Sequence, residues 1–427
     1  MNLRSLPSSA ALALCLAASP ALWPAQAAAA GCTVKVGILL ALSGSLGELG
    51  QDNARSAELA AQEVNAAGGV HGCKVEVALA DTQTQPSVGV TAAKGLVDLK
   101  GVRAIVGANS SGTTMAVMRS VTVPSGVLLV SPTAASTEFT SLSKQGLTKG
   151  LFLRTIMSVK DEGPATAYVA AKLAKWKRIS IVYVNNAFGR TYAETTERTF
   201  EAMGGRARIV PYNLNQPSYR AEVTSALQGN PQALVLIAYP TGGQSILKQW
   251  ISAGGPRHFL LANSVDTQHF VDILGAKYLD GAWGVTLGAQ TGQPGYKAFA
   301  DAFAKHYGKP PSAPYDSNAY DAMAVTLLAM AASPPQAGGR TLAKAARAVT
   351  AGNGVAVGPG VAGYRAALKA LAAGRPVHYV GATGALRIDA LGDVKVPVVV
   401  SRVTAGRLIA AKTLGAHEVE ALTSIAP

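Results

Sequence analysis

Short apolar runs alternate with longer segments of helical periodicity along most of this chain, and that alternation most constrains its fold. The apolar runs lie at residues 34–40, 75–79, 104–107 and 126–130, and again at 178–184, 207–210, 233–238 and 259–262. Strands separated by helices of about 10–15 residues are typical of βαβ units and parallel sheets. Because the pattern stops and restarts, we predict an α/β protein with two doubly wound parallel-sheet lobes.

The intervening segments carry the helical pattern. We expect helices at residues 53–67, 87–99, 114–122, 191–203, 244–253, 320–332 and 340–351. The apolar helix at 320–332 belongs to neither lobe by sequence order alone. Residues 387–389 and 396–403 predict strand, turn and strand, but Pro397 has no N–H for a sheet ladder, so 395–400 cannot be central strand throughout.

The first 27 residues predict a cleaved secretory signal. Arg4 supplies the positive start, residues 10–18 a short apolar stretch, and residues 25–27 (AQA) the small-residue cleavage pattern. A retained anchor is the alternative, since no charge follows Arg4 until Lys35. Pro20 and Pro24 interrupt that stretch, however, and no later segment has the length and apolarity of a membrane span. We therefore expect an exported, periplasmic protein, soluble after cleavage.

Export to an oxidising compartment would allow the cysteines of the mature chain to form a disulfide. Cys15 lies in the signal, which leaves Cys32 and Cys73, each two residues before an expected strand. Neighbouring parallel strands lie about 4.8 Å apart, within the reach of a disulfide. We predict a Cys32–Cys73 bridge; two buried free thiols are the alternative.

Composition and motifs exclude several functions. The 427 residues have a formal charge of +14, but the basic residues are scattered, so we expect no nucleic-acid partner. None of the six histidines lies in a metalloprotease motif, and neither a nucleophile elbow nor a phosphate loop occurs. We predict a protein that is not an enzyme and holds no cofactor or metal.

Open parallel sheets bind ligands beyond the carboxyl ends of their strands. Two such sheets in one exported chain give two crevices that can face each other and enclose a small molecule by closing about a hinge.

A series of short motifs occurs in order along the chain. They are residues 36–39 (VGIL) with 42–44 (LSG), 65–70 (NAAGGV), 80–82 (ADT), 106–107 (VG), 131–132 (SP), 320–322 (YDA) and 381–384 (GATG). The series resembles the leucine/isoleucine/valine-binding type of periplasmic binding protein. That resemblance implies two lobes joined by three crossovers, with lobe 1 at 32–153 plus 287–378 and lobe 2 at 154–286 plus 379–427. It also implies delivery of a small molecule to the membrane permease subunits of an ABC importer, and we expect a monomer.

The resemblance assigns ligand contacts in lobe 1. A serine after the third strand, which grips a carboxylate, corresponds to Ser111, beside Ser110. A hydroxyl with loop N–H groups at a helix start suits an anion, although an ordinary helix cap is the alternative. In the next loop, Thr133 would contribute backbone groups beside Ala134. Ala135 lacks the expected hydroxyl, which Thr133 or Ser136 could replace.

In lobe 2 the resemblance points to two aromatic residues over the ligand, Phe188 and Tyr239, which could equally anchor loops. The acid that binds an ammonium falls near neutral Asn263, with Asp266 a substitute or a helix cap. Losing that acid while keeping the serine suits a carboxylate that lacks an ammonium, such as an aliphatic or aromatic acid, and a neutral amide is the alternative. We predict a small carboxylate ligand, amino acid or not. The same clamshell could serve a membrane receptor as a sensor.

Overall fold

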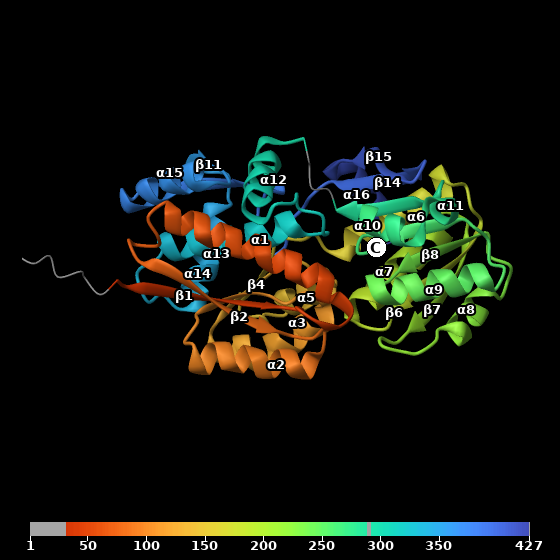
Figure 1. Ribbon diagram of the computed structural model, residues 1–427, viewed down its shortest axis with the longest axis horizontal. Coiled ribbons are helices and arrows are strands. Elements are labelled where there is room, and N and C mark those ends of the chain that lie inside the picture. Colours follow the sequence, from red (N-terminus) through yellow and green to blue (C-terminus); the bar gives the residue numbers. More distant parts are fainter. Residues whose placement is uncertain (1–30, 288–291, 427) are drawn as a thin grey trace, which may run out of the picture.

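The computed structural model describes residues 31–287 and 292–426, which form two α/β lobes side by side along the long axis (Figure 1). The predicted signal, residues 1–27, lies outside the described residues. The two predicted sheets are present, one in each lobe.

Lobe 1 contains a five-stranded parallel sheet in the order β2-β1-β3-β4-β5. Its strands are β1 (Thr33–Leu40), β2 (Lys74–Asp81), β3 (Ala104–Gly107), β4 (Leu128–Ser131) and β5 (Phe152–Arg154). Its helices include α1 (Gly47–Ala66), α2 (Pro86–Lys94), α3 (Ser111–Val117), α5 (Glu138–Lys144), α13 (Asp316–Ala331) and α14 (Gly339–Val349). The apolar helix that sequence order left unassigned is α13, and it packs along α1 in this lobe.

Lobe 2 contains a seven-stranded sheet in the order β15-β14-β10-β9-β8-β6-β7. Its strands are β6 (Arg178–Val184), β7 (Arg206–Tyr212), β8 (Ala233–Ile237), β9 (Phe259–Ala262), β10 (Trp283–Leu287), β14 (Val398–Thr404) and β15 (Arg407–Leu414). Its helices include α6 (Val159–Tyr168), α7 (Ala187–Ala202), α8 (Arg220–Leu227), α9 (Pro240–Ser252), α10 (Gln268–Leu274), α11 (Ala276–Leu279) and α16 (Ala416–Thr423). The doubly wound part is parallel, whereas β14 runs antiparallel to β10 and β15.

The disulfide prediction is confirmed. Strands β1 and β2 pair in parallel with Thr33 opposite Lys74, so the preceding residues also face each other. Cys32 and Cys73 are bonded, with their Cα atoms 4.8 Å apart. The bridge joins the starts of the two strands, at the end of the sheet opposite to their carboxyl ends.

A small third sheet, β11-β12-β13, extends lobe 1. It consists of β11 (Val355–Val357), β12 (Val377–Gly381) and β13 (Gly384–Ala385), with α12 (Pro294–Tyr307) and α15 (Val361–Ala372) against it. We propose the predicted domain division with one adjustment. Because β12 straddles the predicted boundary after residue 378 and pairs only within this sheet, we place the third crossover after Ala385.

Three local predictions differ from the structure. Residues 387–389 are not a strand: the N–H of Ile388 donates to Thr350 Oγ1 instead. As Pro397 requires, β14 begins only at Val398, but β15 was not predicted. Helix α1 starts at Gly47, six residues before the predicted Asn53, and includes Gly50, where the helix passes close to the backbone of Ala41. A Cβ at Gly50 would lie 1.8 Å from the carbonyl oxygen of Ala41.

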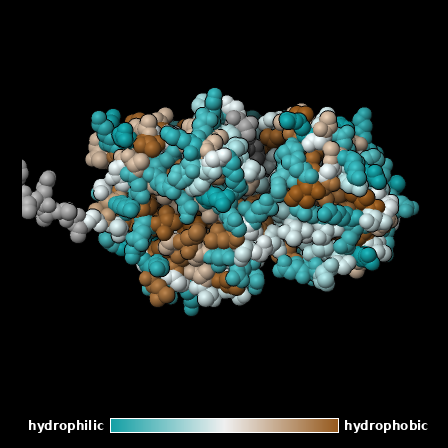
Figure 2. Space-filling model, in the orientation of Figure 1, coloured by the Kyte–Doolittle hydropathy of each residue, from teal (hydrophilic) through white to brown (hydrophobic). Residues whose placement is uncertain are grey.

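Polar side chains cover most of the visible surface, with a brown area over the face of lobe 1 where β2 lies (Figure 2). The edge strand β2 contributes Leu79, which is 46% exposed. Among the described helices, none combines the length and apolar character needed to cross a bilayer.

Candidate functional site

A small cavity lies where loops after the strands of both sheets meet, and we call it the inner cavity. It is lined by Leu46, Leu49, Asn109, Ser111, Thr133, Phe188, Tyr239, Asn263, Ser264 and Tyr315. Its volume of about 20 Å³ is close to the space that one water molecule needs. Of the predicted ligand contacts, the structure brings Ser111, Thr133, Phe188, Tyr239 and Asn263 together here. Ser110, Ala134, Ala135, Ser136 and Asp266 are not among the lining residues.

Hydroxyl groups form the lobe 1 wall. Ser110 is the N-cap of α3, and its Oγ accepts from the N–H of Thr113 at 3.1 Å. Ser111 Oγ accepts from the N–H of Ser136 at 3.2 Å, and Thr133 Oγ1 donates to the carbonyl of Asn109 at 2.6 Å. Every polar side chain of this wall is therefore held in place by its own lobe.

A buried arginine supports the loop behind that wall. Arg154, at the end of β5, donates from Nη1 to the carbonyl oxygens of Ala134 (3.1 Å) and Ser136 (3.0 Å). Its charge is balanced by Asp393, whose Oδ1 lies 2.8 Å from Nε. Burial lowers the pKa of Arg154, and Asp393 raises it again. Residues 134–136 thus hold Arg154 and Ser111 through backbone groups of Ala134 and Ser136. The side chains of Ala134 and Ala135 are buried.

Aromatic rings form the lobe 2 wall. Phe188, in the first turn of α7, and Tyr239, just before α9, stack with their ring centroids 6.1 Å apart. Asn186 links them: its Oδ1 accepts from the N–H of Gly189, and its Nδ2 donates to Tyr239 Oη at 2.9 Å. Burial raises the pKa of Tyr239 to about 12, so this hydroxyl stays protonated at neutral pH.

Behind the aromatic wall lies a buried carboxyl group. Asn263, which follows β9, donates from Nδ2 to Glu162 Oε2 on α6 at 2.7 Å, and Ser264 Oγ donates to Asn263 Oδ1 at 3.1 Å. Glu162 is fully buried, and burial raises its pKa to about 8, although Tyr192 and Asn263 lower it. This glutamate was not predicted from the sequence.

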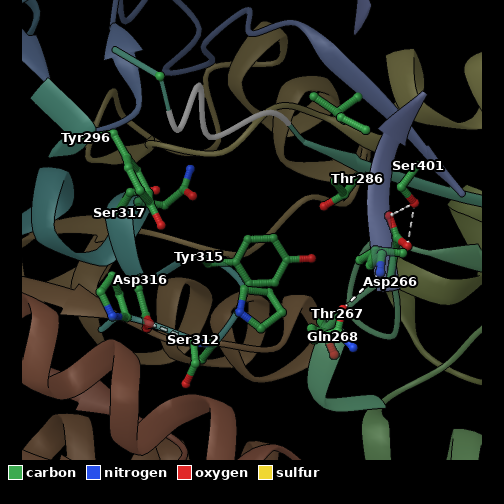
Figure 3. A pocket seen from close by; sticks show the side chains of 18 of the residues that line it. Asp266, Thr267, Gln268, Thr286, Tyr296, Ser312, Tyr315, Asp316, Ser317 and Ser401 are labelled. Carbon is green, nitrogen blue, oxygen red and sulfur yellow. Dashed lines mark hydrogen bonds between the residues drawn. The ribbon is translucent and has the colours of Figure 1, made fainter. Parts of the chain in front are cut away.

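Tyr315 separates the inner cavity from a larger one of about 740 Å³, which we call the outer cavity. Figure 3 shows its ring in the middle of the outer cavity, with the hydroxyl toward the side that carries Asp266 and Thr286. The predicted candidate Asp266 lines this outer cavity, where Ser401 Oγ donates to both of its carboxyl oxygens at 2.7 Å. Burial raises the pKa of Asp266 to about 7.

A polar network fixes the loop that carries Tyr315. Asn53 Nδ2 donates to Asp316 Oδ1 at 2.9 Å, and Asn109 Nδ2 donates to Asn53 Oδ1 at 3.1 Å. Asn109 Oδ1 in turn accepts from the N–H of Ala41, at the end of β1. Tyr315 has a φ of +70°, a left-handed conformation that is unfavourable for a bulky side chain and needs support of this kind.

Several contacts join the lobes near the cleft, among them the side-chain interactions of Tyr239 with Ser110 and of Tyr315 with Ser264. Ser45 Oγ donates to Asn215 Oδ1 at 2.9 Å, and Glu48 forms an ion pair with His269 at 2.8 Å. Both members of the ion pair are largely exposed. These contacts and the small inner volume describe a closed arrangement of the lobes.

The residues that sequence reasoning missed lie in segments without a strong pattern. Tyr315 follows the irregular stretch at 308–314 (GKPPSAP), and Glu162 lies in a helix that was not predicted. Within residues 31–287 and 292–426, no group of histidine, cysteine or acidic side chains has the arrangement of a metal site.

Comparison with known proteins identifies the fold family. Residues 33–380 match the periplasmic binding protein family, which is most of the chain. The chain belongs to this family. Members of it are non-enzymatic binding proteins, in agreement with the absence of a catalytic motif in the sequence.

Curated relatives of this binding protein differ in their stated roles. It is 29% identical over 84% of its length to a substrate-binding protein of a chemotactic signal transduction system from Halobacterium salinarum, of which it covers 84%. It is 25% identical over 69% of its length to a leucine-, isoleucine-, valine-, threonine- and alanine-binding protein from Pseudomonas aeruginosa, of which it covers 76%.

Solved structures show the same two-lobed fold. A leucine-binding protein from Thermotoga maritima superposes with a TM-score of 0.76 at 21% identity, covering 90% of this chain and 99% of that one. A solute-binding protein of an ABC transporter from R. palustris, in complex with benzoate, gives a TM-score of 0.70 at 18% identity, covering 89% and 96%. The predicted fold class and family resemblance are thus confirmed.

Proposed function

We propose that this protein captures a small carboxylate solute between its lobes and delivers it to the membrane permease of an ABC importer. The observation that carries the proposal is the inner cavity. Loops after the strands of both sheets line it, and its walls combine hydroxyls from lobe 1 with stacked aromatics from lobe 2. We propose Ser111, Thr133, Phe188, Tyr239 and Asn263 as its ligand contacts.

The chemistry of the walls supports a carboxylate. Ser111 and Thr133 can turn their hydroxyl hydrogens to a carboxylate, and hydrogen bonds to a charged group are stronger than those between neutral groups. Phe188 and Tyr239 offer an apolar face for an aliphatic or aromatic body. Small-molecule sites commonly combine such an apolar lining with a few placed polar groups.

Capture needs movement of the lobes. Because the inner cavity has only about 20 Å³, a carboxylic acid enters only after the lobes separate or Tyr315 moves. Opening breaks the Ser45–Asn215 and Glu48–His269 contacts, which lie between the lobes. A closed form that differs from the open form gives the membrane partner a signal that the solute is bound.

The names of relatives support this role and leave the ligand class wide: they include binders of branched-chain amino acids and of benzoate. We further propose that residues 1–27 direct export to the periplasm, where the mature protein acts as a monomer.

A thermal-shift screen tests the function. Leucine, benzoate, other small carboxylates and amides are added to the mature protein, because a ligand that binds only the native state raises its melting temperature as the excess grows. We expect a rise with at least one carboxylate. The proposal fails if no acid and no amide shifts the transition.

A second candidate is a sensory role, favoured by the relative from a chemotactic system, which this chain matches over 84% of its length. In a strain that lacks this protein, the transport role predicts loss of solute uptake with intact taxis. The sensory role predicts the reverse.

A further inference from the structure

The inner cavity has no charged side chain among the described residues that line it. Its polar side chains are two amides, two serines, a threonine and two tyrosines. An ammonium group enclosed there would have hydrogen-bond acceptors but no carboxylate in contact, and a buried charge without a partner is costly. The uncharged lining therefore disfavours solutes that carry an ammonium group.

Asn263 is the lobe 2 side chain best placed to contact a polar group of the solute. It is 1% exposed, lines the inner cavity, and has one amide hydrogen committed to Glu162 at 2.7 Å. Its oxygen accepts from Ser264 at 3.1 Å and retains a second lone pair. A neutral amide held in this way can accept from a hydroxyl or an N–H, but it cannot balance a positive charge.

Glu162, one layer behind Asn263, does not supply that balance either. Its Oε1 has no hydrogen-bond partner among the described residues, and no basic group contributes to its electrostatic surroundings. The titratable groups that face it are Tyr192 from α7, Tyr315 and Asp266. On the other side of α6, the contact of α16 is from Thr423 to Asp161. Burial keeps the Glu162 carboxyl protonated at neutral pH, with a pKa of about 8.

We propose that the inner cavity selects a carboxylate whose second polar group, facing Asn263, is an uncharged hydroxyl or amide rather than an ammonium, and that Glu162 is the positioning residue that orients Asn263 for this group. This inference rests on the proposed function and narrows its substrate class. A protonated Glu162 also spares the solute carboxylate a like charge nearby.

Two matched series of acids test the selectivity by calorimetry. The aliphatic series is leucine, 2-hydroxy-4-methylpentanoate and 4-methylpentanoate, and the aromatic series is phenylglycine, mandelate and phenylacetate. Within each series only the group beside the carboxylate changes, from ammonium to hydroxyl to hydrogen. We expect the hydroxy acid of at least one series to bind about tenfold or more tightly than its amino acid, which corresponds to about 1.4 kcal/mol.

The pH dependence separates the two possible roles of Glu162. Affinity for the hydroxy acid should fall as the pH rises through about 8, because ionised Glu162 then repels the solute carboxylate. In Glu162→Gln the amide stays neutral, so binding at pH 7 should persist and the loss above pH 8 should vanish. Glu63→Gln is the control: it removes a buried carboxyl of α1 that accepts from Tyr320, away from the cavity, and should leave the pH profile unchanged.

A charge moved into the cavity should reverse the selectivity. In Glu162→Gln/Asn263→Asp the carboxylate lies at the cavity wall, and we expect the amino acid to gain about tenfold over the hydroxy acid. The inference is overturned if the wild type prefers the amino acid and Glu162→Gln abolishes that binding, since Glu162 would then supply the charge from behind Asn263. In that case the proposed function stands. If no acid in either series and none in the wider screen binds, the proposed function itself fails.

Discussion

The two walls of the inner cavity are built in opposite ways. In lobe 1, Ser111 and Thr133 are small and neutral, and each hydroxyl has a partner in its own lobe. In lobe 2, stacked rings line the cavity together with Asn263, and the buried Glu162 behind Asn263 has one carboxyl oxygen without a hydrogen-bond partner among the described residues. The polar groups of the lobe 1 wall are therefore hydrogen-bonded within their own lobe, whereas lobe 2 holds a buried and incompletely hydrogen-bonded carboxyl group behind its wall.

We infer from this difference that the two lobes contribute differently to solute binding. Ser111 accepts from Ser136 and can donate to the carboxylate, the feature that all candidate solutes share, whereas Thr133 can donate to it once its hydrogen turns from the Asn109 carbonyl. We expect lobe 2 to distinguish between solutes, because the hydrogen bonds of its buried Glu162 are incomplete. A small change in the solute then alters the free energy of burying that group. The predictions below test this division, starting with the largest expected effect.

Removing the hydroxyls of the lobe 1 wall should weaken every carboxylate alike. For Ser111→Ala/Thr133→Val we expect a loss of about 100-fold or more in affinity, since two hydrogen bonds to a charged group contribute about 1.5–3 kcal/mol each and 100-fold corresponds to about 2.7 kcal/mol. Titration calorimetry with the best acid of the screen measures it. Thr350→Val is the matched control, because it removes a buried, bonded hydroxyl of the same lobe outside the cavity. An equal loss in the control would remove the lobe 1 wall from the binding site.

The buried glutamate of the lobe 2 wall should cost stability. At pH 4 Glu162 is mostly protonated in both states, but between about 4.5 and 8 only the unfolded chain ionises, so the cost grows with pH. Glu162→Gln should therefore stabilise the protein by about 2–3 kcal/mol at pH 7 and by little at pH 4.

Melting temperatures at the two pH values measure this gain, and Asp321→Asn is the comparison. Asp321 is equally buried, but its carboxyl accepts hydrogen bonds from Tyr379 and from the Ala382 and Thr383 segment. An amide cannot accept them all, so Asp321→Asn should destabilise. If both variants lose stability at pH 7, Glu162 is as well satisfied as Asp321, and the contrast between the walls disappears.

The sequence located residues of both walls, but it missed what lies behind and between them, for a physical reason. The lining residues that were predicted all lie in loops or helix starts that follow buried strands, so periodicity and the rule for strand ends locate them together. They are Ser111 and Thr133 in lobe 1 and Phe188, Tyr239 and Asn263 in lobe 2. Glu162 lies behind the cavity on α6, and Tyr315 reaches the cavity from an irregular loop of lobe 1. At both positions only packing decides what the side chain contacts. In the sequence, Asn109 looks like an ordinary loop residue and Asn53 like the start of a helix. Nothing in the pattern indicates that the two side chains are hydrogen-bonded to each other.

Tyr315 lies between the walls and should control the size of the solute. Tyr315→Ala should join the inner and outer cavities, which measure about 20 and 740 Å³. We expect the affinity ratio of naphthoate to benzoate to rise about tenfold, as measured by calorimetry. Tyr296→Ala enlarges the outer cavity alone and serves as the control. An unchanged ratio in Tyr315→Ala would mean that the lobes, not this ring, limit the solute.

We expect the smallest effect on affinity at the rim of the cleft, where the side chains that join the lobes are exposed to solvent. The ion pair of Glu48 with His269 has side chains that are 72% and 51% exposed, and such pairs contribute about 0–1 kcal/mol. Glu48→Gln should therefore change affinity by less than about fivefold, and less again at high salt, because solvent screens exposed charges. Ser45→Ala, which removes the partly buried hydrogen bond to Asn215, should have the larger effect on closure. A loss in Glu48→Gln as large as that from the lobe 1 hydroxyls would show that rim charges, rather than the cavity walls, hold the lobes together around the solute.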